Sequence, residues 1–286
     1  MKTTTVRGLL RAQTPVHHGG DERTGNCTML RRMPYMVDGE RRAVPVVSGN
    51  SIRGQWRRVV MQDLCELVEY VPTLQIYHTL FAGGVLQSVP GTTARIDRHL
   101  RDAVRDWLLP LSILGGGLGN QLIPGKLQVG LVTPLCHELD PYHDEDRQSD
   151  IPVAQLLDET FHSRRDDLGF RDDVDPTVQM LYSFEIFAAG TQFNHHFTLR
   201  DYSPCEASCV RRMVELWSAN ATLGGHSATG FGKVESDYEW FDDWPLPEDY
   251  VSWVDANKDV VLGALGELEE TLQPKPKKGR SGKGQE

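Results

Sequence analysis

Five segments of regular hydrophobic periodicity limit the fold most strongly, because their order along the chain is strand, helix, strand, strand, helix. Alternating apolar and polar side chains predict strands over residues 2–14, 126–135 and 181–199, the last with a break at Gly190. Apolar residues at helical spacing predict two helices, over residues 52–70 and 204–221. This order favours an α+β fold in which helices cover one face of a sheet.

Composition narrows the class of protein. The chain has 286 residues, of which 39% are hydrophobic, so it can bury a sizeable core. No run of 18 apolar residues occurs, and the N-terminal residues lack a signal-peptide pattern, so we expect no membrane span and a cytoplasmic protein. The five cysteines lack framework spacing, which favours reduced thiols. Cys205 and Cys209 are more consistent with one helix face than with a zinc site, because no second cysteine pair occurs.

Charge is distributed unevenly along the chain. The net charge is −10, yet residues 1–58 contain 11 Lys and Arg against 4 Asp and Glu. The remaining residues therefore carry the whole negative excess. This asymmetry is typical of a basic working surface on an acidic body, although an ordinary solvated face also fits the numbers.

Three further regions are compositionally distinct. Residues 136–178 form an acidic insertion with few large apolar side chains, and an excursion of this length is usually functional or disordered. Residues 236–272 form an acidic C-terminal extension, with a helix predicted over 258–272. Residues 273–286 are basic and rich in Pro and Gly, which predicts a disordered tail. Residues 1–235 then constitute the core domain.

A turn of small polar residues, Ser48-Gly49-Asn50-Ser51, leads into the first helix. Free N–H groups and the helix dipole favour a phosphate at such a terminus, and Asn50 or Ser51 is the expected N-cap. Arg53 and Arg57 lie four residues apart on one helix face, so two guanidinium groups could follow a phosphate backbone. An ordinary capped helix with surface arginines fits the same residues.

A second candidate element is the glycine-rich segment 224–233, which ends in Gly230-Phe231-Gly232-Lys233. Its N–H groups and Lys233 could approach a phosphate while Phe231 stacks on a base. The segment lacks the Gly-Lys-Ser/Thr ending of a Walker loop and does not open a helix after a first strand. A tight turn before a strand is the alternative.

Two kinds of titratable group could carry chemistry. His17 and His18 are adjacent, so they point in different directions and rarely share a metal; an RNA contact or general acid–base catalysis remains open, and binding is favoured. The acidic runs Asp144-Glu145-Asp146 and Asp172-Asp173 could hold Mg²⁺, but clustered carboxylates are usually solvated.

Taken in order, these elements resemble the RAMP superfamily of CRISPR-associated proteins. The resemblance covers roughly residues 3–235 and rests on the following motifs: Thr14-Pro15-Val16-His17-His18-Gly19-Gly20, Val46-Val47-Ser48-Gly49-Asn50-Ser51-Ile52-Arg53-Gly54, Gly125-Lys126-Leu127-Gln128-Val129, Phe184 to Phe193, and Gly230-Phe231-Gly232-Lys233. The chain is most similar to the Cas-seven backbone group. Its Ser-Gly-Asn-Ser turn and Phe81-Ala82-Gly83-Gly84 element are most similar to type IV subunits of that group.

The resemblance implies a modified RRM-like, ferredoxin-like palm with inserted finger and thumb elements, the thumb lying between Leu135 and Leu181. It implies a backbone subunit that polymerises head to tail along guide RNA (crRNA) and presents it for pairing with a target nucleic acid, together with other effector subunits. No cofactor, metal or membrane is expected. The residues expected at the RNA are His17, His18, Arg31, Arg32, Ser48, Asn50, Ser51, Arg53, Arg57, Arg58, Gln192, Phe193, His226, Phe231 and Lys233.

We expect no cleavage by this chain. Type III relatives cut with an aspartate in the loop after the first strand, and neither Asp21 nor Asp38 lies at that position. Two alternatives remain open. The first is an endoribonuclease that processes precursor RNA with His17 or His18, and the second is a metal-dependent phosphohydrolase that uses the acidic insertion. In the first alternative, His17 or His18 would act as a general acid or base rather than as an RNA contact.

Overall fold

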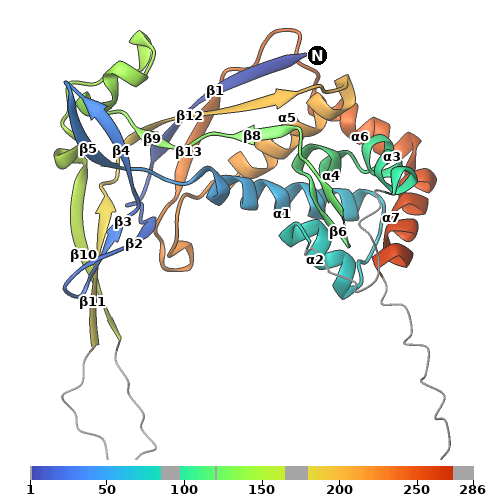
Figure 1. Cartoon of the computed structure of the whole chain (residues 1–286), viewed down its shortest axis with the longest axis horizontal. Helices are drawn as coiled ribbons and strands as arrows, with labels where there is room; N and C mark the ends of the chain where they lie inside the picture. Colours follow the sequence, from blue (N-terminus) through green and yellow to red (C-terminus); the bar gives the residue numbers. More distant parts are fainter. Residues whose placement is uncertain (1, 85–96, 120, 165–179, 273–286) are drawn as a thin grey trace, which may run out of the picture.

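A five-stranded antiparallel sheet crosses the length of the protein (Figure 1). The computed structural model describes residues 2–84, 97–119, 121–164 and 180–272. The sheet strands, in spatial order, are β13 (Val234–Tyr238), β1 (Thr3–Ala12), β12 (Gln192–Arg200) and β8 (Leu127–Val129), with β9 (Thr133–Pro134) also paired to β12. The alternation in the first predicted strand is confirmed, since Val6, Leu10 and Ala12 of β1 point into the core.

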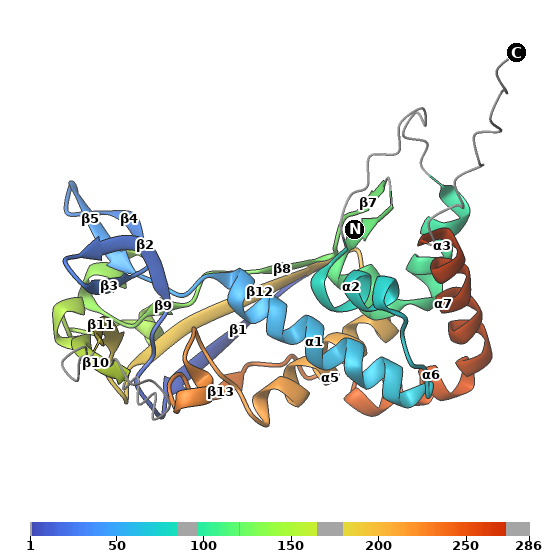
Figure 2. The same ribbon diagram turned by 90° about the horizontal axis from the view of Figure 1, so that it is seen from below.

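Two long helices pack on one face of this sheet, as Figure 2 shows from below. They are α1 (Gly49–Leu67) and α5 (Pro204–Ser218). In chain order these elements run β1, α1, β8, β12, α5, β13, and the first strand lies between the third and the fourth. This is the ferredoxin-like arrangement. The α+β fold with a ferredoxin-like palm that the sequence implied is therefore confirmed.

Aromatic side chains fill the space between helices and sheet. Trp56 of α1 is fully buried, and its ring centroid lies 5.4 Å from that of Phe197 on β12. On α5, Ser203 and Glu206 form a capping box, with Pro204 at the first helical position. Both predicted helices are therefore present, and α5 starts at the predicted residue.

The helical end of the molecule, on the right of Figure 1, adds further helices and a hairpin to the palm. Its elements are α2 (Leu74–Ala82), α3 (Arg98–Trp107), α4 (Leu109–Leu114), β6 (Gly116–Leu118), β7 (Gln121–Ile123), α6 (Pro247–Ala256) and α7 (Lys258–Leu272). The helix predicted over 258–272 is confirmed as α7. Tyr250, Val254 and Leu265 from α6 and α7 join the same hydrophobic core as the palm.

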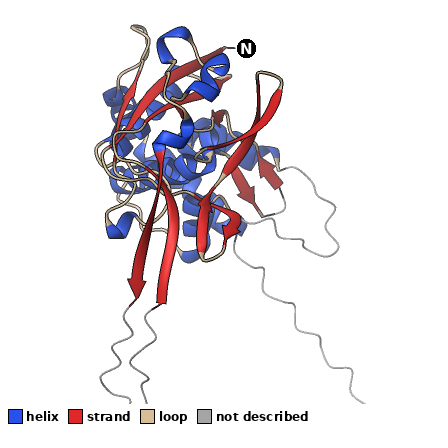
Figure 3. Ribbon diagram, turned by 90° about the vertical axis from the view of Figure 1, so that its left-hand side faces the viewer, coloured by secondary structure: helices blue, strands red, loops and turns tan. Residues whose placement is uncertain are grey.

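The opposite end is rich in strands (Figure 3). A four-stranded sheet has the order β10 (Leu157–Arg164), β11 (Met180–Phe187), β3 (Cys27–Leu30), β2 (Gly19–Thr24), and β4 (Arg32–Val37) pairs with β5 (Glu40–Pro45). The described part of the acidic insertion contains three 3-10 turns, at His137–Tyr142, Glu145–Arg147 and Val153–Leu156, and then β10. Residues 165–178 of the insertion and the predicted tail 273–286 lie outside the described residues.

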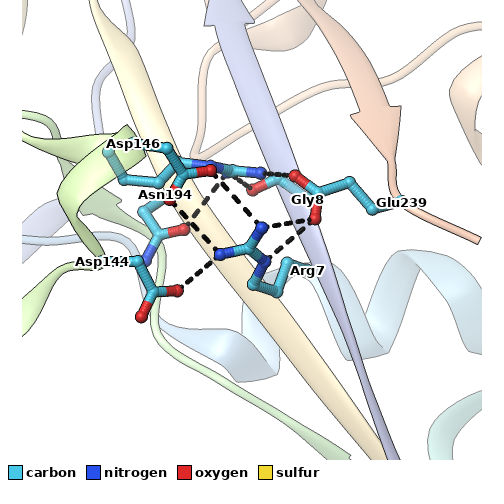
Figure 4. A network of polar contacts seen from close by, with 7 residues as sticks. Arg7, Gly8, Asp144, Asp146, Asn194 and Glu239 are labelled. Atoms are coloured by element: carbon cyan, nitrogen blue, oxygen red, sulfur yellow. Dashed lines mark hydrogen bonds and ion pairs between the residues drawn. The ribbon is translucent and has the colours of Figure 1, made fainter.

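An ion-pair network fastens the insertion to the outer face of the sheet (Figure 4). Arg7 of β1 contacts Asp144 at 2.6 Å and Asp146 at 3.4 Å. Buried Arg147 donates to the carbonyl of Gly8 at 2.8 Å and also pairs with Glu239. Two carboxylates considered as Mg²⁺ ligands are thus engaged by an arginine.

Two local predictions differ from the structure. The strand expected over 126–135 is divided into β8 and β9, and between them the N–H of Gly130 still donates to the carbonyl of His196 on β12. The N-cap of α1 is Ser48 rather than Asn50 or Ser51, since the Ser48 hydroxyl accepts from the N–H of Asn50 at 3.2 Å. Across the described ranges, no helix has the length and apolar character needed to cross a membrane.

Candidate nucleic-acid interface

The Ser-Gly-Asn-Ser turn lies against His18, in the segment that follows β1. The N–H of Ser48 donates to Nε2 of His18 at 3.2 Å, so that nitrogen carries no proton. The carbonyl of His18 accepts from the N–H of Arg31 at 2.8 Å, and the carbonyl of Arg31 accepts from the N–H of Val46. Segments that are far apart in sequence therefore meet at His18.

The start of α1 is held close to the sheet by a glycine. A Cβ at position 49 would collide with the carbonyl oxygens of Val129 and Gly130, so only glycine fits there. Asn50 is exposed and Ser51 is half-buried. Because the first turn of α1 contains no acidic residue, its N–H groups and dipole remain favourable for an anion.

The arginines of α1 differ in what they contact. Arg53 donates to the carbonyls of Leu127 (2.9 Å) and Leu114, and burial lowers its pKa. Arg57 is only 7% exposed and donates to the carbonyls of Leu114 and Gly115, both at 2.9 Å. Burial and the nearby Arg53 lower the pKa of Arg57 to about 10, so it stays protonated at neutral pH. Its guanidinium holds the helical end to α1 and is not presented to a ligand.

The glycine-rich loop is anchored along the residues that follow β1. The N–H groups of Gly225 and Gly232 donate to the carbonyls of His17 and Pro15, both at 2.8 Å. The N–H of Lys233 donates to the hydroxyl of Thr14 at 2.9 Å. Gly232 has a φ of +81° and lies against the carbonyl of Leu223, which a side chain would prevent. The loop is therefore a fixed structure, and it leaves the Lys233 side chain exposed.

Five rings from four chain segments pack where this loop meets β10 and β11. We call them the ring cluster: His17, His162, Phe184, His226 and Phe231. The rings of Phe184 and His226 are stacked, with centroids 4.9 Å apart and planes at 11°. Phe231 is half-buried, with its centroid 5.4 Å from those of Phe184 and His162. Rings of this kind offer stacking faces for bases.

Two members of the ring cluster were not predicted as site residues. Phe184 belongs to a segment quoted for its strand pattern, and alternation alone could not show that it meets the glycine-rich loop. His162 lies in the acidic insertion, where no periodic signal marked it. Both reach the cluster through the pairing of β10 with β11, in which Thr160 opposes Phe184.

The histidines have defined hydrogen bonds. The carbonyl of Glu185 accepts from Nδ1–H of His17 at 2.7 Å, and His17 is 5% exposed. For His18, burial and then the neighbouring Arg31 lower the pKa, which keeps the ring neutral and able to accept from Ser48. Burial and the nearby His17 and His162 also lower the pKa of His226.

The remaining predicted residues have different positions. Arg32 pairs with Glu185 at 2.5 Å, and the second oxygen of that carboxylate accepts from the N–H of Leu30. Arg31 and Gln192 are exposed. Arg58 is exposed as well, but it lines a groove at the junction of α1 and α2, with Tyr70, Tyr77 and Phe81.

Phe193 requires a correction of role. Its side chain is 0% exposed, and its ring packs on Phe187 with centroids 5.0 Å apart. Phe193 and Arg57 therefore stabilise the core and are left out of the interface that we propose. Among the residues described here, no group of three or more His, Cys, Asp or Glu is arranged to hold a metal ion.

Comparisons with known proteins agree with this architecture. No family model matches the chain, and no curated protein matches it. Its fold is similar to that of a chain in a solved structure described as a Type IV-B CRISPR complex, with a TM-score of 0.66 and 23% sequence identity. The match covers 88% of this chain and 98% of that chain. The two chains therefore share one fold over nearly their whole lengths.

Proposed function

We propose that this protein is a guide-RNA backbone subunit of a class 1, type IV CRISPR effector complex. In this proposal, copies of the chain bind crRNA through its phosphates, associate head to tail, and present the guide for pairing with a target in the cytoplasm. Other effector subunits complete the complex. The fold likeness to a chain of a Type IV-B CRISPR complex supports membership of such an assembly.

The observation that carries the RNA-binding role is the junction at His17 and His18. On one side, His18 contacts the turn that opens α1, the positive end of a helix whose first turn contains no acidic residue. On the other side, His17 joins the ring cluster and the glycine-rich loop. A phosphate site and a stacking surface thus lie on either side of one dipeptide, which is what a single-stranded RNA requires.

We further propose that the subunit does not cut RNA. A general acid–base histidine needs a ring nitrogen within reach of the ribose or phosphate. His17 is 5% exposed, and its Nδ1–H is bonded to a backbone carbonyl. Nε2 of His18 already accepts from Ser48. These contacts favour a positioning role for both residues over the endoribonuclease alternative.

Fluorescence anisotropy with labelled single-stranded RNA tests binding. We expect binding that does not depend on RNA sequence and that weakens as the salt concentration rises. In a plot of log affinity against log salt concentration, each phosphate contact should contribute a slope of about −0.7. Lys233→Glu should weaken binding, because it places a negative charge beside the proposed phosphate path. Arg98→Glu changes charge equally on α3, at the helical end, and is the matched control.

Equal losses of RNA affinity in the two variants would contradict the proposed location of the interface, and no RNA binding would contradict the function.

The catalytic alternative is tested by incubating precursor RNA with the protein without metal. Specific cleavage that a His17→Ala/His18→Ala double variant abolishes would replace the non-catalytic role with an endoribonuclease.

A further inference from the structure

A cavity of about 430 Å³ opens at the beginning of β1, remote from the interface described above. It is lined by Lys2, Thr4, Tyr202, Phe241, Asp243 and Trp244, which come from β1, the start of α5 and the segment after β13. In Figure 1 this segment passes beside the N-terminal end of β1. The glycine-rich loop contacts the other end of the same strand, about 25 Å away at ordinary strand rise. Cavities of this volume typically accommodate small organic ligands.

Three aromatic rings with nearly parallel planes form one wall. The centroids of Tyr202 and Trp244 are 5.7 Å apart with planes at 29°, and those of Phe241 and Trp244 are 6.5 Å apart with planes at 24°. Hydrogen bonds to other residues of the lining fix two of these rings. The Tyr202 hydroxyl bonds that of Thr4 at 2.6 Å, and the Trp244 indole N–H donates to the carbonyl of Ala207 at 2.9 Å. Phe241 is 48% exposed, so it offers an open stacking face.

Two charged groups complete the lining. The Lys2 ammonium lies 5.0 Å from the centre of the Tyr202 ring and is exposed to solvent. The Asp243 side chain is exposed as well, and an ionised carboxylate only accepts hydrogen bonds. A ligand complementary to these residues has a planar ring to stack on the aromatic side chains. It also has a negative group to pair with the Lys2 ammonium and two adjacent N–H groups to donate to the Asp243 carboxylate.

We propose that this cavity is a nucleotide site with a preference for guanine. The base would stack on Phe241 and the neighbouring aromatic wall, its phosphate would meet Lys2, and its adjacent N1–H and N2–H groups would donate to Asp243. Adenine fits less well, because it places the acceptor N1 beside its only amino donor. The guanine could belong to a free mononucleotide or to a nucleotide of bound RNA, since both present the same base and phosphate.

Isothermal titration of the full chain with GMP, AMP and CMP tests the site. We expect one GMP bound per chain and affinity for AMP roughly tenfold lower, the usual effect of losing a bidentate contact. Asp243→Asn should abolish the preference for GMP over AMP. Phe241→Ala should weaken every nucleotide about tenfold through lost stacking, whereas Tyr77→Ala, which removes a comparably exposed ring on α2, should change nothing.

The inference does not rest on the proposed RNA-binding function, and Lys233→Glu should leave GMP binding unchanged. Binding of short RNAs that end in G or in A then distinguishes the two sources. A preference for terminal G that Phe241→Ala removes would assign the site to RNA. If the RNAs show no such preference while GMP still binds, the site takes a free nucleotide. No GMP binding, or binding that Phe241→Ala and Asp243→Asn both leave unaltered, would overturn the inference.

Discussion

His17 and His18 are neighbours in the sequence, but their rings serve different parts of the molecule. His17 enters the ring cluster, and His18 accepts a hydrogen bond from the turn that opens α1. The sequence could predict that these side chains diverge, because adjacent residues in extended chain point apart. It could not predict their partners, which come from residues 48, 184 and 226.

At the residue scale, Phe231 is the most direct test of base stacking. Phe231→Ala should lower RNA affinity roughly tenfold, because one stacked base contributes about 1–3 kcal/mol. Anisotropy titration measures the change, and thermal unfolding shows that the fold survives loss of the contacts with Phe184 and His162. Tyr77→Ala on α2 should bind as tightly as the unaltered protein. An unchanged affinity in Phe231→Ala would remove this ring from the RNA path.

The buried ring of His195 should make stability depend on pH. Burial, and then the neighbouring His196, lowers the pKa of His195 from its ordinary 6.5 to about 3. Below pH 6.5 the unfolded chain protonates this residue while the folded chain does not, so stability is lost as the pH falls from 6.5 towards 3. At pH 5 this loss is about 2 kcal/mol.

Denaturant unfolding at pH 7.5 and pH 5 measures that loss. His195→Gln should remove most of the pH dependence, whatever it does to stability at pH 7.5. His196→Gln alters the exposed neighbour on the same strand and should retain the dependence. A pH dependence that is the same in both variants would show that other groups cause it.

At the element scale, periodicity predicted most of the palm and little of what surrounds it. In the segments that form β1, α1, α5 and α7, apolar residues recur at strand or helix spacing along the whole segment. The predicted type of each of these elements is confirmed. The short elements β2 to β5, α2 to α4 and α6 were not predicted, although local signals mark some of them: the Asp38-Gly39 turn joins β4 to β5, and the Asp97 side chain caps α3. Arg57 was predicted at the RNA because helical spacing shows on which face of α1 it lies. The spacing does not show that its guanidinium is bonded to the carbonyls of Leu114 and Gly115.

Gly49 shows how a single close contact positions an element. Gly49→Ala should destabilise the protein by about 1–3 kcal/mol, because the added methyl meets the carbonyls of Val129 and Gly130. Gly263→Ala is the matched control within α7, where a Cβ would meet nothing within 4 Å. That change should stabilise the protein by about 0.5–1 kcal/mol through helix propensity. Chemical denaturation measures both, and equal effects would contradict the close packing of α1 on the sheet.

Arg147 attaches the acidic insertion to the sheet through a buried guanidinium group. Arg147→Ala should cost about 2 kcal/mol, because the Gly8 carbonyl and the Asn194 side chain lose a buried donor, while half-exposed Glu239 is re-solvated. Limited proteolysis should then cut residues 137–156 faster. Arg42→Ala, which removes an exposed pair with Glu40, should change stability by less than about 0.5 kcal/mol. Unchanged proteolysis in Arg147→Ala would show that other contacts hold the insertion.

At the scale of the whole molecule, net charge is a poor guide to what the protein binds. Asp144 and Asp146 of the acidic insertion and Glu239, which follows β13, all contact Arg7 of β1, so these carboxylates are paired within the protein. Exposed Arg31 and Lys233 lie instead beside the His17–His18 junction. The sequence predicts a basic surface in the N-terminal part, whereas the contacts of the insertion with the sheet required the three-dimensional arrangement.

The central claim is that copies of this chain coat a guide RNA. The most direct measurement is nuclease digestion of the complex purified from cells that transcribe a CRISPR array, followed by sizing of the protected RNA. The account predicts a guide-derived ladder whose lengths increase by one constant number of nucleotides, because each added subunit covers the same stretch. Absence of co-purifying RNA, or a single protected length that does not change with the number of subunits, would contradict it.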